Sequence, residues 1–165
     1  MNTDCIEVQR AIAADPAAIF DLLRTPLGHV AIDASGMLMA ATGDPATATG
    51  DRFVVHMDRE SLQDHPLGEY DVTVVITTFD PGREIAWTVE GAIQPPIGHI
   101  YGYRLEEIDG GTLVTSYYDW SNIHEQWREA TGLFPVVSEI NQRATLGILA
   151  RTVAPGRGRP GAEND

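Results

Sequence analysis

Alternation of apolar and polar residues opens the chain and predicts a half-buried strand. In the segment CIEVQRAI (residues 5–12) the apolar residues recur with a period of about two, which is typical of a strand with one buried face. Asp15-Pro16 then starts a helix, because Asp is a good N-cap and proline suits the first helical position. Thr25-Pro26 ends this helix, and we expect a second short helix over about residues 27–32.

The middle of the chain predicts four or five strands. Apolar positions again recur every second residue at 53–58 and at 72–77. Asp80-Pro81-Gly82 and Asp109-Gly110-Gly111 are typical of tight turns between strands. Connections this short imply antiparallel neighbours. The stretch at 34–50, rich in Gly, Ala and Thr, is expected to be a loop.

A long helix is predicted near the C-terminus, from about Pro135 to Val153. Its apolar positions recur at helical spacing and indicate the face that we expect to pack into the sheet. These positions are Val137, Ile140, Ala144 and Ile148. Residues 155–165 (PGRGRPGAEND) contain too few apolar residues to bury anything, so we expect a mobile tail after a single domain over residues 1–154.

The order of these elements predicts an α+β fold with an internal cavity. We expect a curved antiparallel sheet of six or seven strands wrapped around the long C-terminal helix, with two short helices after the first strand. A sheet that curves around one helix leaves space between them, and we expect the functional site there. Four small residues in the last helix leave room beside it: Ala144, Gly147, Ala150 and Ala154.

Composition and charge exclude several classes of protein. The 165 residues are 43% hydrophobic and carry a formal net charge of −13, which disfavours binding to nucleic acids and to anionic lipid surfaces. Cys5 is the only cysteine, so no intramolecular disulfide can form. The N-terminus lacks the apolar core of a signal peptide, and no apolar run has the roughly 20 residues that a membrane helix needs. We expect a cytoplasmic protein without integral membrane association.

Three stretches resemble the START/polyketide-cyclase (SRPBCC) superfamily, which has the helix-grip fold. The first is VQRAIAADPAAIFDLLRTPLGHVAIDASG, similar to the opening of polyketide cyclase/dehydrase-type bacterial members. The second, TGDRFVVHMD, is similar to the start of the family's second strand. The third, YGYRLEEIDGGTLVTSYYDW, resembles its penultimate hairpin. The resemblance covers about residues 4–154.

This resemblance implies a fold but leaves three functions open. The first is binding of a small hydrophobic or polycyclic ligand (lipid, polyketide or sterol-like) between the sheet and the last helix. The second is a cofactor-independent enzyme of polyketide cyclase/dehydrase type. The third is an interaction module whose interior is filled by side chains. No cofactor is implied by any of them.

Aromatic and apolar residues on the expected inner surface are the candidate ligand-binding residues. His99, Tyr101 and Tyr103 share one face of a strand, and Trp87 lies on the neighbouring strand. A tyrosine hydroxyl can donate a hydrogen bond while its ring packs on apolar surface. Tyr117 and Tyr118 point in opposite directions, so one of them faces inward. The complete predicted ligand-binding set is Trp87, His99, Tyr101, Tyr103, Tyr118, Trp120, Ile140 and Ala144. Around Trp120 we expect the wall of the opening, one end of the core or a contact in a homodimer.

His29 and Asp33 are the candidate catalytic residues. Spaced four apart, they would share one side of a helix, where an Asp can orient a His as a general base. The alternative is that the two residues only shape the entrance of the cavity. A metal site is not expected, because His56 and His99 have no third ligand at a recognisable spacing.

Overall fold

A seven-stranded antiparallel sheet, curved around the C-terminal helix, forms the body of the protein. The computed structural model describes residues 3–130 and 132–161. The elements in chain order are β1 (Cys5–Ile12), α1 (Pro16–Leu23), α2 (Pro26–Ile32), β2 (Leu38–Thr42), β3 (Arg52–Asp58), η1 (Glu60–Leu62), β4 (Glu69–Asp80), β5 (Glu84–Gly91), β6 (Ile100–Ile108), β7 (Gly111–Asp119), α3 (Glu125–Arg128) and α4 (Glu139–Val153). The predicted helix-grip fold, with two short helices after the first strand, is confirmed.

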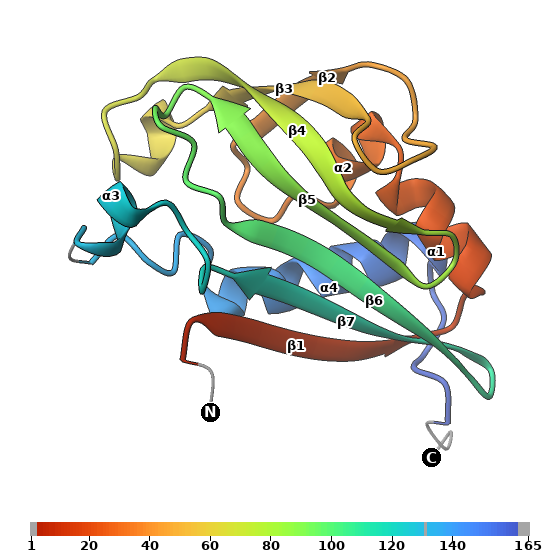
Figure 1. The fold of residues 1–165 in the computed structure, drawn as a ribbon. Helices are drawn as coiled ribbons and strands as arrows, with labels where there is room; N and C mark the ends of the chain where they lie inside the picture. Colours follow the sequence, from red (N-terminus) through yellow and green to blue (C-terminus); the bar gives the residue numbers. More distant parts are fainter. Residues whose placement is uncertain (1–2, 131, 162–165) are drawn as a thin grey trace.

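The strands lie in the order β1-β7-β6-β5-β4-β3-β2. From β2 to β7 each strand pairs with its successor in the chain, as the short predicted turns require. The exception is β1, which pairs with β7 in a register that sets Cys5 opposite Asp119 and Ile12 opposite Thr112. In Figure 1, β1 and β2 accordingly form the two edges of the sheet.

The concave face of the sheet carries the core, because alternate residues of each strand point toward the helices. Figure 1 shows α4 behind β6, β7 and β1, with α1 and α2 beside it toward the other end of the sheet. The sheet contributes buried apolar residues from several strands, and the helices cover them with their own. This set includes Val8, Val55, Val74, Ile85, Val114, Ile19, Leu23, Leu146 and Leu149.

Two local expectations from the sequence are wrong. The predicted loop at 34–50 contains a short strand, β2, which pairs with β3. The last helix begins at Glu139 and not at Pro135. Its N-cap is Ser138, whose side chain accepts a hydrogen bond from the backbone N–H of Asn141 at 3.1 Å.

The predicted inner face of α4 is wrong at Ile140 and Ala144, whereas Ile148 does pack against the core. Ile140 is 79% exposed and Ala144 is exposed as well, so neither lies between the helix and the sheet. The residues that α4 buries are Gln142, Leu146 and Leu149. The helix therefore turns a different face inward, with a polar residue in its first buried position.

Part of the predicted tail contacts the body of the protein. Arg157 donates a hydrogen bond from Nη1 to the carbonyl of Ala13 at 3.2 Å. The last part of the tail, residues 162–165, lies outside the described residues. No helix in the described part of the chain has both the length and the apolar character needed to cross a membrane.

Candidate functional site

A cavity of about 780 Å³ lies between the concave sheet, α2 and the start of α4. Its size falls in the range of roughly 300–1,000 Å³ that is usual for small-molecule sites. Apolar side chains from β3, β4 and β5 line its interior. Three exposed apolar side chains also line it: Leu62 at the end of η1, Leu67 in the loop before β4 and Ile93 in the loop after β5.

Aromatic rings from β5, β6 and β7 form one wall of this cavity. The rings of Trp87 and Tyr101 stack with an interplanar angle of 14° and centroids 6.1 Å apart. Tyr103 stacks on the same Trp87 at 5.9 Å and 29°. Tyr118 continues the wall, with its ring centroid 4.8 Å from that of Tyr101. The structure thus brings together four of the predicted ligand-binding residues.

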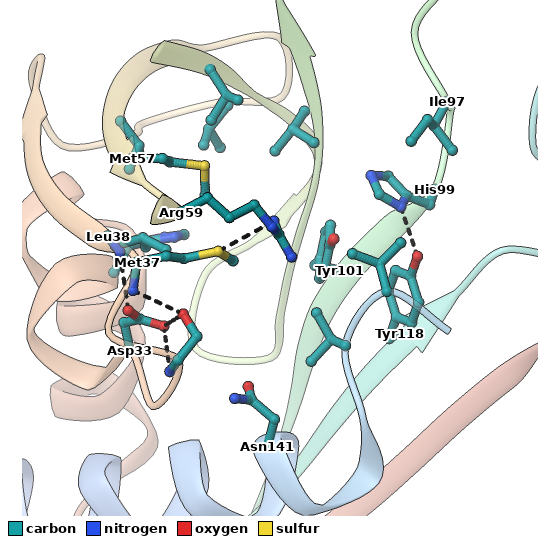
Figure 2. Close-up of a pocket in the computed structure, with 18 of the residues that line it drawn as sticks. Asp33, Met37, Leu38, Met57, Arg59, Ile97, His99, Tyr101, Tyr118 and Asn141 are labelled. Atoms are coloured by element: carbon teal, nitrogen blue, oxygen red, sulfur yellow. Dashed lines mark hydrogen bonds between the residues drawn. The ribbon is translucent and has the colours of Figure 1, made fainter. Parts of the chain in front are cut away.

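His99 extends the aromatic wall and adds a polar group to it. Its Nδ1 lies 2.7 Å from the hydroxyl of Tyr118, whereas its Nε2 is buried and has no hydrogen-bond partner among the described residues. Figure 2 shows this second nitrogen on the side of the ring away from the Tyr118 hydroxyl. Burial lowers the pKa of His99 to about 4, so the ring is neutral at pH 7. Of the two adjacent tyrosines, Tyr118 places its ring in this wall, whereas the Tyr117 hydroxyl donates a hydrogen bond to Glu84.

A buried arginine, which the sequence did not indicate, enters the cavity from the end of β3. Arg59 is 9% exposed and pairs with Asp64 through two hydrogen bonds of 2.9 Å, from Nε and from Nη2. Its Nη1 donates to the Tyr70 hydroxyl at 3.3 Å and lies 3.4 Å from the sulfur of Met37. The guanidinium in turn lowers the pKa of Asp64 to about 2. This cluster ties the loop after β3 to the sheet.

The two predicted catalytic residues line the cavity, but the structure gives them separate partners. His29 Nε2 lies 2.7 Å from the carbonyl oxygen of Leu23, and burial lowers its pKa to about 4. Asp33 accepts hydrogen bonds from the backbone N–H and the hydroxyl of Ser35 and from the N–H of Leu38. His29 and Asp33 do not share one side of a helix, as was predicted, because α2 ends at Ile32 and the backbone of Asp33 is already extended. No hydrogen-bonded His–Asp pair forms here.

Gln142 is a second polar residue of the cavity that sequence reasoning missed. It is 5% exposed, and neither its amide nitrogen nor its amide oxygen has a hydrogen-bond partner among the described residues. A glutamine in a helix carries no signal that distinguishes the inner face from the outer one.

Three of the predicted ligand-binding residues do not line the cavity. Ile140 and Ala144 lie on the outer side of α4. Trp120 follows β7 and packs its ring 5.3 Å from that of Tyr118, outside the cavity lining. Among the described residues, no three His, Cys, Asp or Glu side chains come together in a way that could hold a metal ion.

Comparison with known proteins identifies the fold. No family model matches the sequence, and no curated protein matches it. Solved structures do match it. A Chromobacterium violaceum protein has a TM-score of 0.67 at 14% identity, over 93% of this chain and 99% of that one. The Aha1 dimer of Colwellia psychrerythraea gives 0.60 at 17% identity, over 93% and 98%. An AHSA1-like protein of Aeromonas hydrophila gives 0.58 at 16%, over 90% and 91%. The chain therefore shares the helix-grip fold of these solved structures, two of which are an Aha1 and an AHSA1-like protein.

Proposed function

We propose that the protein binds a small hydrophobic or polycyclic ligand, such as a lipid, polyketide or sterol-like compound, in the cavity between the sheet and α4. The observation that supports this most is the cavity itself, about 780 Å³ in size with a mainly apolar lining. Ligand sites of this kind combine apolar walls with a few polar groups that orient the ligand. His99 and Gln142 are polar residues of this lining, but their unpartnered atoms are buried, so a ligand would reach these atoms only after the side chains rotate.

The two alternative functions have less support. An interior filled by side chains, which an interaction module requires, does not agree with a cavity of this size. An enzyme of polyketide cyclase/dehydrase type needs a base held by a second group, and His29 and Asp33 are not bonded to each other. A homodimer and a cytoplasmic location stay predictions. The Colwellia neighbour is a dimer.

Two neighbouring residues of α4 offer a matched test of ligand binding. Thr145 lines the cavity, whereas Ala144 is exposed. The neutral fluorescent probe N-phenyl-1-naphthylamine is titrated into the wild type and into the variants Thr145→Trp and Ala144→Trp. We expect saturable binding by the wild type and by Ala144→Trp, and at least tenfold weaker binding by Thr145→Trp, because the new indole occupies the cavity.

Near-ultraviolet circular dichroism of both variants serves as the control for intact tertiary packing. If the wild type does not bind the probe, or if the two tryptophan variants bind it equally well, the cavity is not a ligand site.

A further inference from the structure

Arg10 in β1 carries a charge that no neighbouring residue balances. It shares the inner side of the strand with the buried residues Val8 and Ile12. A Cβ added at Gly147 of α4 would lie 3.8 Å from its Nη1, so the guanidinium lies beside the helix. Its Nε is buried without a hydrogen-bond partner among the described residues. Its two terminal nitrogens make no hydrogen bond to a described residue either, but they are not buried, so a solute can reach them.

The segment after α4 brings a second arginine to the same place. Arg157 is held by its hydrogen bond to the carbonyl of Ala13, just after β1. Pro160 packs against the turn at residues 110–111, between β6 and β7. Figure 1 shows the segment passing the end of β1 and this turn. The two contacts fix the position of Arg159, which lies between Arg157 and Pro160 in the sequence.

The positive charges at this end of the protein have no acidic partners. Burial and the nearby guanidinium of Arg159 both lower the pKa of Arg10. Arg151 adds a further charge, because it follows Gly147 by one turn on the same side of α4. Five arginines elsewhere form ion pairs with Asp or Glu. The arginines at this end, which form no such pair with a described residue, are Arg10, Arg151, Arg157 and Arg159.

A doubly charged anion offsets such a cluster better than a singly charged one. An unpaired, partly buried charge is costly, and a bound anion removes this cost. A phosphate monoester carries a charge of about −1.5 to −2 at pH 7, and its oxygens accept parallel hydrogen bonds from a guanidinium. The net charge of −13 does not prevent binding of a small ion, because charges farther away than about 8 Å are largely screened at physiological salt. An anionic membrane would face much more of that charge.

From these observations we infer that Arg10 and Arg159 bind the phosphate group of a small soluble compound, where β1, α4 and the segment after α4 meet. This site is separate from the cavity, because neither arginine is among the residues that line the cavity. It therefore does not depend on the function proposed for the cavity.

The Nε–H group of Arg10 reports directly on binding. Glycerol 3-phosphate is titrated into the ¹⁵N-labelled protein at constant pH and ionic strength. The Arg10 Nε–H signal, assigned by its loss in Arg10→Gln, is followed in ¹H–¹⁵N spectra. We expect a saturable shift of this signal. Acetate, which carries a single charge, should bind at least about tenfold more weakly.

Two arginine variants show whether the site is local. Arg159 is exposed, so Arg159→Gln removes its charge without disturbing the core. The affinity for glycerol 3-phosphate should fall about tenfold, because a charge-assisted hydrogen bond is lost. The matched control is Arg128→Gln, on α3 at the other end of the sheet in Figure 1, which should change the affinity by less than about twofold. Equal losses in the two variants would show general attraction of anions and would overturn the inference.

The remaining outcomes separate a soluble phosphate from other anions. The absence of a saturable shift, or acetate binding as tight as that of glycerol 3-phosphate, would overturn the inference. So would sedimentation of the protein with phosphatidylcholine vesicles that contain phosphatidic acid, if glycerol 3-phosphate does not bind.

Glu163 and Asp165 lie outside the described residues, so the titration is repeated with Glu163→Gln and Asp165→Asn combined in the full chain. We expect the same affinity as in the wild type. Binding that is seen only after this double replacement would assign the site to carboxylates of the chain itself and would also overturn the inference.

Discussion

Replacing Gln142 with methionine should stabilise the protein without ligand. The glutamine is 5% exposed, and both polar atoms of its amide are buried without a partner. Leaving a buried polar group unpaired costs about 1–3 kcal/mol. Methionine has nearly the same length and a similar helix propensity, so the helix itself should gain or lose little. We expect Gln142→Met to raise the free energy of unfolding by about 1–3 kcal/mol.

Equilibrium unfolding in urea, followed by tryptophan fluorescence, measures this gain. A higher midpoint with an unchanged slope shows a true change in stability. Gln126→Met, on the exposed side of α3, is the matched control and should change the free energy of unfolding by no more than about 0.5 kcal/mol. If Gln142→Met is neutral or destabilising against this control, the amide of Gln142 is hydrogen-bonded in solution and the reasoning is refuted.

Two further predictions concern stability. Because His29 and His99 titrate near pH 4 in the folded state, against about 6.5 in the unfolded chain, the unfolded state binds more protons between these values. These two histidines should make stability fall from pH 6.5 toward pH 4, by up to about 3 kcal/mol for each histidine. A flat profile from pH 7 to pH 5 in urea unfolding would contradict this. Ile140→Asp should change the free energy of unfolding by about 0.5 kcal/mol or less, because the side chain is 79% exposed. Leu149→Ala, at a fully buried position, should lower the free energy of unfolding by about 2–5 kcal/mol. Equal losses in the two variants would contradict the observed inner face of α4.

The sheet could be predicted from the sequence because its signals are local. Alternation in β4 places Val72, Val74 and Ile76 on one face, and all three are buried as the pattern predicts. Tight turns then join neighbouring strands. The missed strand β2 reads LMAAT, which has no alternation and no β-branched residue before its last position. Its strand conformation comes from pairing with β3, which is a tertiary effect.

The inner face of α4 could not be predicted because the helix offers two apolar stripes. Ile140, Ala144 and Ile148 recur at helical spacing, and so do Leu146 and Leu149 on another side. The spacing of apolar residues cannot show which of these two stripes is buried, because the polar residue Gln142 interrupts the buried stripe. The aromatic part of the site was predictable because alternation in β6 fixes the directions of its side chains. The His99–Tyr118 contact and the Arg59–Asp64 pair depend on tertiary structure that no spacing reveals.

The pairing of the first strand with the last constrains how the chain folds during synthesis. Gln9 in β1 donates a hydrogen bond to the Thr115 hydroxyl in β7, 106 residues later, at 3.0 Å. At the usual rate of translation, these two residues leave the ribosome about 5–20 s apart. Until then Val8 and Ile12 have no strand to pair with, while β2 to β6 can already form hairpins. A nascent chain that stops before residue 112 therefore keeps an unpaired apolar strand at its N-terminus, where other chains can reach it.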